Sequence, residues 1–132
     1  MPLCRETMTL VLPIPPDEIY MTLLDVECHC LLTGWEMEMD PCAGGIYRSE
    51  GGEIEGIVQS LNPADRLVFD LRRPEMQLEE PIRVDIFLEP IDDGTRIFFH
   101  HLNVPKEHLE DWCTFWKESY VEPLALFFED DE

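Results

Sequence analysis

The hydrophobic periodicity of the chain changes once, near Pro105, and this change limits the possible folds more than any other feature. Before that point, apolar residues mostly alternate with polar ones, which is typical of strands with one buried face. After it, apolar residues recur at steps of three and four up to Phe128, the spacing of one long amphipathic helix. The stripe consists of Leu109, Trp112, Trp116, Tyr120, Leu124 and Phe127. The sequence therefore predicts a sheet whose apolar face is covered by the final helix.

The segment before this change begins with one expected strand and two expected short helices. Arg5 to Pro13 alternates well enough for a strand with one buried face. Pro15 to Glu18 marks a helix start, because proline fits the first turn and early carboxylates suit the positive end of the helix dipole. A second helix is expected from Val26 to Thr33, where Gly34 suits a left-handed cap and leads Trp35 into the core.

Six further strands are expected before Pro105, separated by turns rich in glycine, proline and aspartate. Their ranges are Glu36–Asp40, Gly44–Arg48, Glu53–Leu61, Leu67–Arg72, Ile82–Glu89 and Thr95–His101. Pro123 predicts a kink in the final helix because proline lacks the helical N–H donor. Residues 129–132 are expected to form an acidic tail. This order predicts an α+β fold, with a curved antiparallel sheet of about six to seven strands wrapped around the long C-terminal helix and two short helices after the first strand.

The charge of the chain excludes several classes of partner. Its 132 residues contain 29 acidic and 9 basic side chains, which gives a formal net charge of −20. Such a field repels nucleic acid and anionic membrane surfaces, so the expected partner is neutral, apolar or basic. The length suits a single domain over residues 1–132. No apolar run approaches the ~18 residues that cross a membrane, and no signal peptide is recognisable, so a cytoplasmic location is expected.

The cysteines and carboxylates do not form a recognisable metal motif. Five cysteines at irregular spacing favour reduced thiols over a disulfide framework: Cys4, Cys28, Cys30, Cys42 and Cys113. Residues two apart on a helix point in different directions, so Cys28-His29-Cys30 favours small buried thiols over a zinc site. A row of carboxylates at Glu36, Glu38 and Asp40 lacks the spacing of a calcium loop and favours a solvated face. We therefore expect no metal and no other cofactor.

Several short strings, in order along the chain, resemble one known family. The strings are Pro16-Asp17-Glu18-Ile19-Tyr20 with Leu23 and Asp25, Trp35, Gly44-Gly45, Gly56-Ile57-Val58, Pro63, Arg66-Leu67, Gly94-Thr95 with Ile97, Phe99 and His101, Val104-Pro105, and Trp116 with Tyr120 and Leu124. Together they resemble the activator of heat-shock-protein-90 ATPase homologue-like family, a branch of the START and polyketide-cyclase-like superfamily. The resemblance covers nearly the whole chain, from about residue 6 to 128.

This resemblance implies a helix-grip fold, in which a sheet grips the C-terminal helix and leaves a space between them. It also implies that the 132 residues are occupied by this fold, without the separate chaperone-binding domain of the eponymous co-chaperones. Many single-domain relatives have no assigned activity. One departure concerns the expected space: many relatives carry Trp in the strand after Arg66-Leu67, whereas this chain has Leu71.

The aromatic residues of the strands and the final helix are candidates for lining that space. An apolar pocket with a few polar groups suits a small apolar or amphipathic ligand. The candidates are Trp35, Tyr47, Phe69, Phe99, His101, Trp112, Trp116 and Tyr120, with Tyr20 nearby in the first helix. The competing interpretation is that these residues are simply core, and in this fold the same residues can serve both purposes.

His101 is the candidate with the most defined chemistry. Strand alternation places it on the same inward face as Ile97 and Phe99, where it could meet a ligand or transfer a proton. The competing interpretation, which we favour, is a packed histidine bonded to a backbone carbonyl or to Tyr120. His100 should point the other way. No nucleophile elbow, phosphate loop, dinucleotide fingerprint or metalloprotease motif accompanies it.

Three functional hypotheses follow. The first is a non-enzymatic domain that holds a small hydrophobic or amphipathic molecule between sheet and helix, which requires a cavity with room for a few carbon atoms. The second is a co-chaperone-like interaction module whose acidic surface meets a basic patch on a partner. The third, least favoured, is a cyclase- or hydrolase-like enzyme using His101, which must then face an open cavity. Outward Phe87 and Phe98 on neighbouring strands indicate a dimer patch, so both a monomer and a homodimer are considered.

Overall fold

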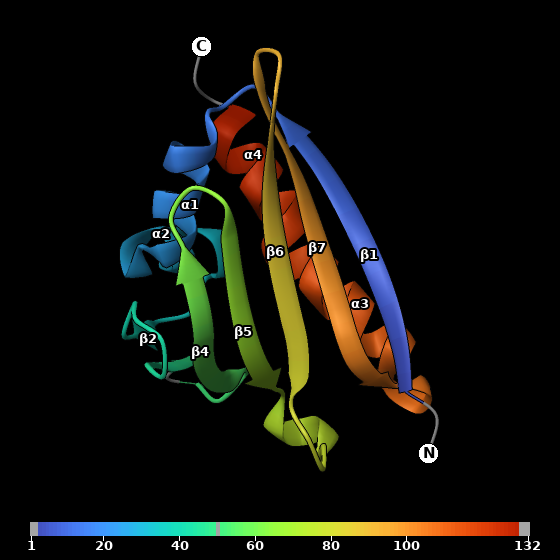
Figure 1. Cartoon of the computed structure of the whole chain (residues 1–132). Coiled ribbons are helices and arrows are strands. Elements are labelled where there is room, and N and C mark those ends of the chain that lie inside the picture. Colours follow the sequence, from blue (N-terminus) through green and yellow to red (C-terminus); the bar gives the residue numbers. More distant parts are fainter. Residues whose placement is uncertain (1–2, 50, 130–132) are drawn as a thin grey trace.

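A computed structural model describes residues 3–49 and 51–129, which form one curved antiparallel sheet and a set of helices on one of its faces (Figure 1). The strands lie in the order β1-β7-β6-β5-β4-β3-β2. The elements are β1 (Leu3–Leu12), α1 (Pro16–Leu24), α2 (Val26–Thr33), β2 (Met37–Met39), β3 (Ile46–Ser49), β4 (Glu55–Asn62), β5 (Arg66–Arg72), η1 (Pro74–Met76), β6 (Ile82–Ile91), β7 (Gly94–Pro105), η2 (Lys106–His108), α3 (Leu109–Trp116), η3 (Lys117–Val121) and α4 (Glu122–Glu129). This order confirms the predicted helix-grip fold.

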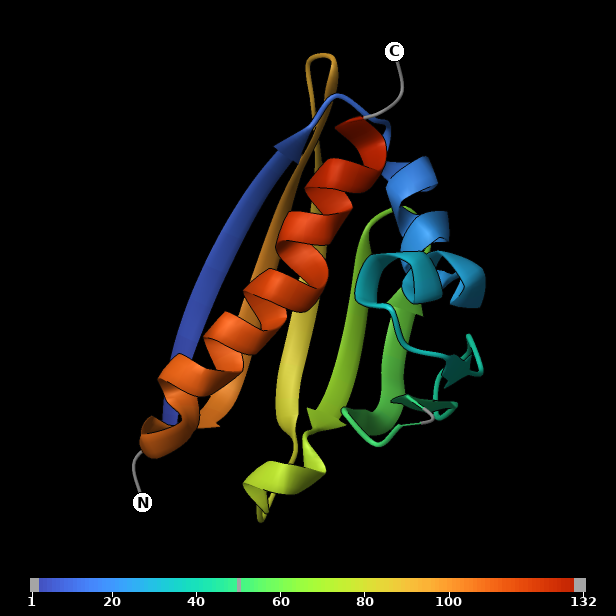
Figure 2. The ribbon, with the colours of Figure 1, turned by 180° about the vertical axis from the view of Figure 1, so that it is seen from behind.

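The long C-terminal helix runs obliquely across the concave face of the sheet (Figure 2). It consists of α3, the π-helical turn η3 and α4, which follow one another without a break. The short helices α1 and α2 lie beside it on the same face. None of the helices in the described part of the chain is long and apolar enough to span a membrane.

The central strands bury one face, as the alternation predicts. On β6 the inward residues are Ile82, Val84, Ile86 and Leu88, and each is at most 1% exposed. On β7 the inward residues are Thr95, Ile97, Phe99 and His101. Because side chains on a strand alternate between faces, these residues form a continuous layer beneath the C-terminal helix. The interior therefore lies between the sheet and this helix.

The two short helices begin and end where the sequence predicts. Pro16 lies in the first turn of α1, and Ile19 and Leu23 from its inner side are buried. The Asp25 side chain accepts hydrogen bonds from the backbone N–H groups at the start of α2. Gly34 ends α2 with φ 81°, a left-handed conformation that glycine adopts without steric cost.

The π-helical turn explains how the final helix keeps one face buried. Its buried side chains are Trp112, Trp116, Tyr120, Leu124 and Phe128, which are four residues apart throughout. In a regular α-helix, four residues overshoot one turn by about 40°, so this stripe would rotate away from the sheet. The wider turn at Lys117–Val121, where the Glu122 N–H donates to the Lys117 carbonyl, corrects the drift.

The predicted irregularity near Pro123 therefore takes the form of a π turn directly before the proline. One part of the predicted stripe is wrong. Phe128 is buried, whereas Phe127 is only half-buried, because the π turn inserts one residue into the register. Glu129 is the last residue of α4, and residues 130–132 of the predicted acidic tail lie outside the described residues.

Candidate functional site

The space between sheet and helix contains one small cavity, beneath the π turn. Nine residues line it: Leu23, His29, Tyr47, Phe69, Ile86, Phe99, Trp116, Tyr120 and Leu124. Five of the eight predicted cavity residues are in this set. The cavity volume is about 10 Å³, which is room for about one water molecule.

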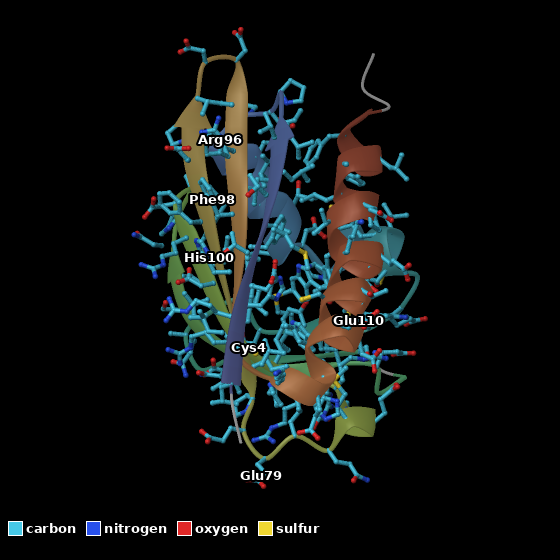
Figure 3. The ribbon with its side chains drawn as sticks, turned by 90° about the vertical axis from the view of Figure 1, so that its right-hand side faces the viewer. Cys4, Glu79, Arg96, Phe98, His100 and Glu110 are labelled. Atoms are coloured by element: carbon cyan, nitrogen blue, oxygen red, sulfur yellow. The ribbon has the colours of Figure 1, made fainter. Side chains whose placement is uncertain are left out.

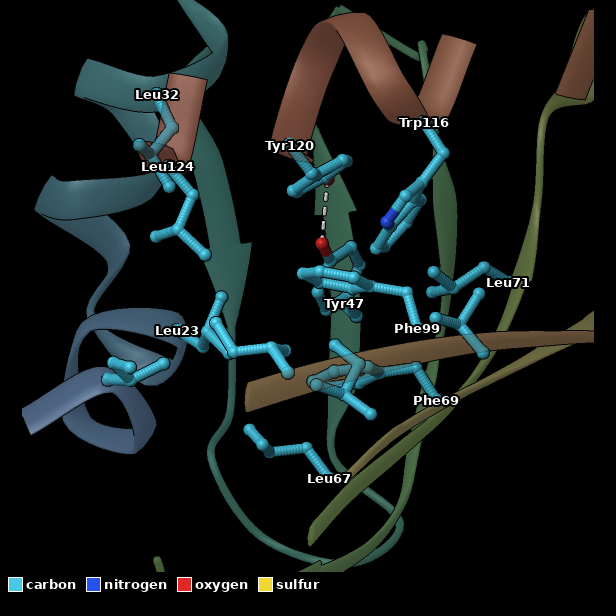
Figure 4. Packing of buried hydrophobic residues seen from close by; sticks show 14 of the residues in the cluster. Leu23, Leu32, Tyr47, Leu67, Phe69, Leu71, Phe99, Trp116, Tyr120 and Leu124 are labelled. Carbon is cyan, nitrogen blue, oxygen red and sulfur yellow. Dashed lines mark hydrogen bonds between the residues drawn. The ribbon is translucent and has the colours of Figure 1, made fainter. Parts of the chain in front are cut away.

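Among the described residues, the expected ligand-sized cavity is therefore not found at the place predicted for it, between the sheet and the C-terminal helix. Aromatic side chains fill the space instead (Figure 4). Trp116 stacks on Tyr120 with ring centroids 4.0 Å apart, and Tyr47 packs on Phe69 at 5.1 Å. The core interpretation of these aromatic residues is the one that this arrangement supports.

A pair of tyrosine hydroxyls lies at the centre of the site. The hydroxyl oxygens of Tyr47 on β3 and Tyr120 in the π turn are 2.7 Å apart and share one hydrogen bond (Figure 4). Burial raises the pKa of both hydroxyls, and the neighbouring Tyr120 raises that of Tyr47 further. Because one hydrogen bond uses only one of the two hydroxyl hydrogens, the pair retains one donor.

The sequence interpretation did not predict four of the nine lining residues, Leu23, His29, Ile86 and Leu124, and His29 of α2 is the one with a polar side chain. Its ring is 2% exposed and meets the rings of Tyr47 and Tyr120 edge-on, at centroid distances of 5.8 and 5.7 Å. Its Nε2 lies 2.6 Å from the Leu23 carbonyl oxygen, so Nε2 carries the proton and donates. Nδ1 is then a buried acceptor without a hydrogen-bond partner among the described residues. Burial lowers the pKa of His29.

The available signal for His29 was the spacing within its helix. His29 and Leu32 are three residues apart, and both are buried on the inner side of α2. The sequence interpretation concentrated on the flanking thiols and expected them to be buried. That expectation is wrong, since Cys28 and Cys30 are only half-buried and the histidine between them occupies the interior.

His101 lies in the same interior but does not line the cavity. It is fully buried, and its Nδ1 accepts a hydrogen bond of 3.0 Å from the indole N–H of Trp112. The predicted packed histidine is thus present, but its partner is Trp112 rather than a carbonyl or Tyr120. Burial, and to a lesser extent the neighbouring His100, lowers the pKa of His101 to about 4. A neutral, enclosed ring does not meet the requirement of the enzyme hypothesis for access to an open cavity.

The remaining predicted residues support the core from its edge. Trp112 is completely buried beneath the first turns of the helix. Trp35 is half-buried and stacks on Phe115 at 5.5 Å, and the Arg73 guanidinium lies over the Phe115 ring, 3.8 Å from its centroid. Neither tryptophan lines the cavity. In the described part of the chain, no group of three or more metal-ligating side chains is found.

The predicted aromatic pair, Phe87 and Phe98, lies on the outer face of the sheet but is less exposed than expected. Phe87 and Phe98 stack at 6.0 Å and are half-buried rather than exposed, and Phe98 also stacks on His100. Figure 3 shows Phe98 and His100 on the side of the sheet away from the helix. His100 thus points away from the core, as predicted. These rings cover one another, which weakens the evidence for a dimer patch.

The sequence comparison identifies the family. The family model described as "Activator of Hsp90 ATPase homolog 1-like protein" matches residues 13–129. The chain belongs to this family. All nine cavity residues of this family member lie within the matched span, whereas β1 precedes it. No curated protein matches the chain at a significant level.

Solved structures show the same fold at low sequence identity. An HSP90 activator from Plasmodium falciparum is 17% identical, with a TM-score of 0.85 over 93% of this chain and 94% of that one. CalU16 from Micromonospora echinospora is 18% identical, with a TM-score of 0.81 over 96% and 77%. The Aha1 dimer from Colwellia psychrerythraea is 16% identical, with a TM-score of 0.78 over 98% and 99%. These similarities show that this family member has the fold of the helix-grip proteins.

Proposed function

We propose that this chain is a protein-interaction module of the co-chaperone type, which presents an acidic surface to a basic surface of its partner. The observation that carries the proposal is the distribution of charge over the two faces of the molecule. The helices α1, α2, α3 and α4 lie on one face of the sheet (Figure 2). On them and their connections, exposed carboxylates far outnumber the exposed lysines Lys106 and Lys117. The carboxylates are Asp17, Glu18, Asp25, Glu27, Glu107, Glu110, Asp111, Glu118 and Glu122.

The outer face of the sheet has a different character. There, Arg66 pairs with Asp85, Arg83 with Asp70, and Arg96 with Glu89. These pairs join neighbouring strands and neutralise one another locally. The negative charge of the helical side is not balanced in this way, so it attracts a basic surface and accelerates its approach.

The family supports an Hsp90-type chaperone as the partner to test. Its description refers to activators of Hsp90 ATPase, and the structure of the Plasmodium falciparum activator is matched over nearly its whole length. The filled interior adds support: the cavity lined by Tyr47, Trp116 and Tyr120 has room for about one water molecule, so the chemistry available to a protein partner lies on the surface. The proposed activity is therefore binding of a basic chaperone surface by the helical side.

The test is a binding titration between this chain and purified Hsp90 from the same host, repeated at rising salt. Affinity should fall as salt rises, because screening weakens attraction between opposite charges. A variant with Glu110→Gln, Asp111→Asn and Glu118→Gln should bind at least about tenfold more weakly. The matched control carries Glu36→Gln, Glu55→Gln and Asp92→Asn, three exposed carboxylates away from the long helix, and should change affinity far less. Absence of binding, or equal losses in both variants, would contradict the proposal.

Binding of a small amphipathic molecule is the second candidate function. It is favoured by two buried nitrogen atoms on residues that line the cavity, His29 Nδ1 and Trp116 Nε1, neither of which has a partner among the described residues. One accepts and the other donates a hydrogen bond, which suits a hydroxyl group. A ligand larger than a water molecule requires the side chain of Trp116 or Tyr120 to move, because the cavity volume is about 10 Å³. Native mass spectrometry of gently purified protein should then release a bound molecule under denaturing conditions, and a clean apo mass would count against this function.

A further inference from the structure

The edge of the sheet formed by β1 is long and unpaired. β1 is the first strand in the sheet order and pairs only with β7. Figure 1 places it at the margin of the sheet, and Figure 3 views the molecule from that margin, with the other strands to the left of β1 and the helix to its right. Alternate residues of an edge strand direct their N–H and C=O groups outward, away from the sheet. Among the described residues, no further backbone hydrogen bond reaches these groups.

The half of β1 from Thr7 to Leu12 lacks the features by which proteins usually prevent strand pairing. Such features are short length, proline, lysine and inward-pointing charges. β1 has ten residues, and from Thr7 to Leu12 it contains neither charge nor proline. Val11 is 54% exposed. The only irregularity is a bulge between Cys4 and Glu6, at the far end of the strand.

The opposite edge of the sheet shows the contrast. β2 has only three residues, and its central Glu38 is exposed between two buried methionines. A short edge with a charge offers little for another strand to pair with. The two edges are therefore not equivalent, and only β1 is suited to strand addition.

We propose that two copies of this chain pair through their β1 edges, antiparallel across a two-fold axis, so that the two sheets become continuous. A second copy is the occupant that the sequence of the edge fits. With the axis at Thr9, Met8 opposes the partner's Leu10 on one face, and Thr7 opposes the partner's Val11 on the other. Antiparallel pairing keeps side chains of like character on the same face, and no charge opposes a like charge in this register.

The net charge of −20 makes this edge the favourable place for self-association. Two copies repel each other over most of their acidic surface, and the repulsion is smallest where the contact itself carries no carboxylate. Added salt screens that repulsion, so the dimer should become tighter as salt rises. This response is opposite to the one expected for binding of a basic partner, and the two proposals can therefore fail independently.

The test is sedimentation velocity of the whole chain at low and high salt. The protein should sediment as a dimer of the 15.4 kDa chain, with a smaller dissociation constant at high salt. Thr9→Glu places two carboxylates at the axis and should raise the dissociation constant at least about tenfold. Thr114→Glu makes the same change at an exposed position on α3 and should leave the dimer intact.

Hydrogen exchange provides a second measurement that locates the interface. Amides of Thr7 to Leu12 that face the free edge should exchange more slowly as the protein concentration rises. If Thr9→Glu prevents folding, as judged by circular dichroism, Val11→Glu on the same outer face replaces it. A protein that stays monomeric at high concentration in both salts would overturn the proposal, and so would a dimer that survives the β1 substitution.

Discussion

Two buried histidines, His29 of α2 and His101 of β7, pack against the same long C-terminal helix, and their surroundings differ. The His29 region consists of His29, Tyr47 and Tyr120, and the His101 region consists of His101 and Trp112. In the first, Nε2 donates to a backbone carbonyl, and the unpaired Nδ1 belongs to a ring that lines the cavity. In the second, Nδ1 accepts from Trp112, Nε2 has no partner among the described residues, and the ring does not line that cavity.

The difference shows that burial alone does not make a histidine a functional group. The inward direction of His101 is the easier one to predict, because it follows from strand alternation. Its ring is nevertheless enclosed by packed indoles. His29 has a free acceptor, a neighbouring hydroxyl pair and a small space beside them. The cavity between sheet and helix therefore belongs to the His29 region.

Trp116 joins the two regions, and its removal is the largest expected effect. It meets His101 edge-on at 5.4 Å and stacks on Tyr120 at 4.0 Å. Trp116→Ala should lower the free energy of unfolding by about 3–5 kcal/mol, because it deletes a buried ring and leaves a cavity. Chemical denaturation measures this loss. Trp35→Ala removes a half-buried ring and should cost clearly less. Similar losses in the two variants would contradict the larger contribution expected of Trp116.

The pH dependence of stability separates His101 from the rest of the protein. Its pKa is about 4 in the folded chain, against an ordinary value of 6.5, so the unfolded chain binds a proton that the folded chain rejects. Stability is therefore lost as pH falls from about 6.5 towards 4. Between about pH 7.5 and pH 5 the contribution of His101 amounts to about 2 kcal/mol.

The matched variant for this prediction is His101→Gln, which does not titrate but retains an acceptor for the Trp112 N–H. Its unfolding free energy should fall less steeply between the two pH values than that of the unaltered chain. Carboxylates contribute equally to both proteins and cancel in the difference. His29, whose pKa is also lowered by burial, remains in both and sets the residual slope. Equal slopes would show that folding does not lower the pKa of His101.

The fold was predictable because its signals are local and repeated. Alternation along β6 and β7, the proline and carboxylates before α1, and Gly34 after α2 each act within a few residues. These signals suffice for the order of elements. The register at the end of the helix was not predictable in the same way, because the choice of Phe128 over Phe127 depends on a π turn that tertiary packing favours.

The site was only partly predictable, for a related reason. Tyr47, Tyr120 and Trp116 face inward because of their periodicity, but periodicity does not reveal whether they meet or leave a space. The volume between sheet and helix depends on how several aromatic rings interlock, which is a property of the packed core. His29 was hidden because its short helix carries a weak apolar pattern and two cysteines that drew a different interpretation.

The tyrosine pair provides a smaller effect that sharpens the description of the His29 region. Tyr47→Phe and Tyr120→Phe should each destabilise the protein by about 1–2 kcal/mol, because each leaves the other buried hydroxyl without its partner. The double variant should cost less than the two single costs together. A double-mutant cycle by chemical denaturation measures this coupling. Additive costs would indicate that each hydroxyl finds another partner, such as a water molecule in the cavity.

The smallest expected effect concerns the origin of the π turn that brings Tyr120 to the cavity. If proline caused the turn, Pro123→Ala would restore a regular α-helix and move Phe127 inward. We expect instead that the turn persists, because the four-residue spacing from Trp112 to Phe128 stays buried only with the wider turn. Pro123→Ala should then change the unfolding free energy by less than about 1 kcal/mol, since the regained N–H offsets the greater freedom of the unfolded chain. Nuclear Overhauser contacts from the Phe128 ring to the core measure the register. Their replacement by contacts from Phe127 would assign the turn to the proline, and the His29 region would then depend on one backbone donor rather than on the packing of five side chains.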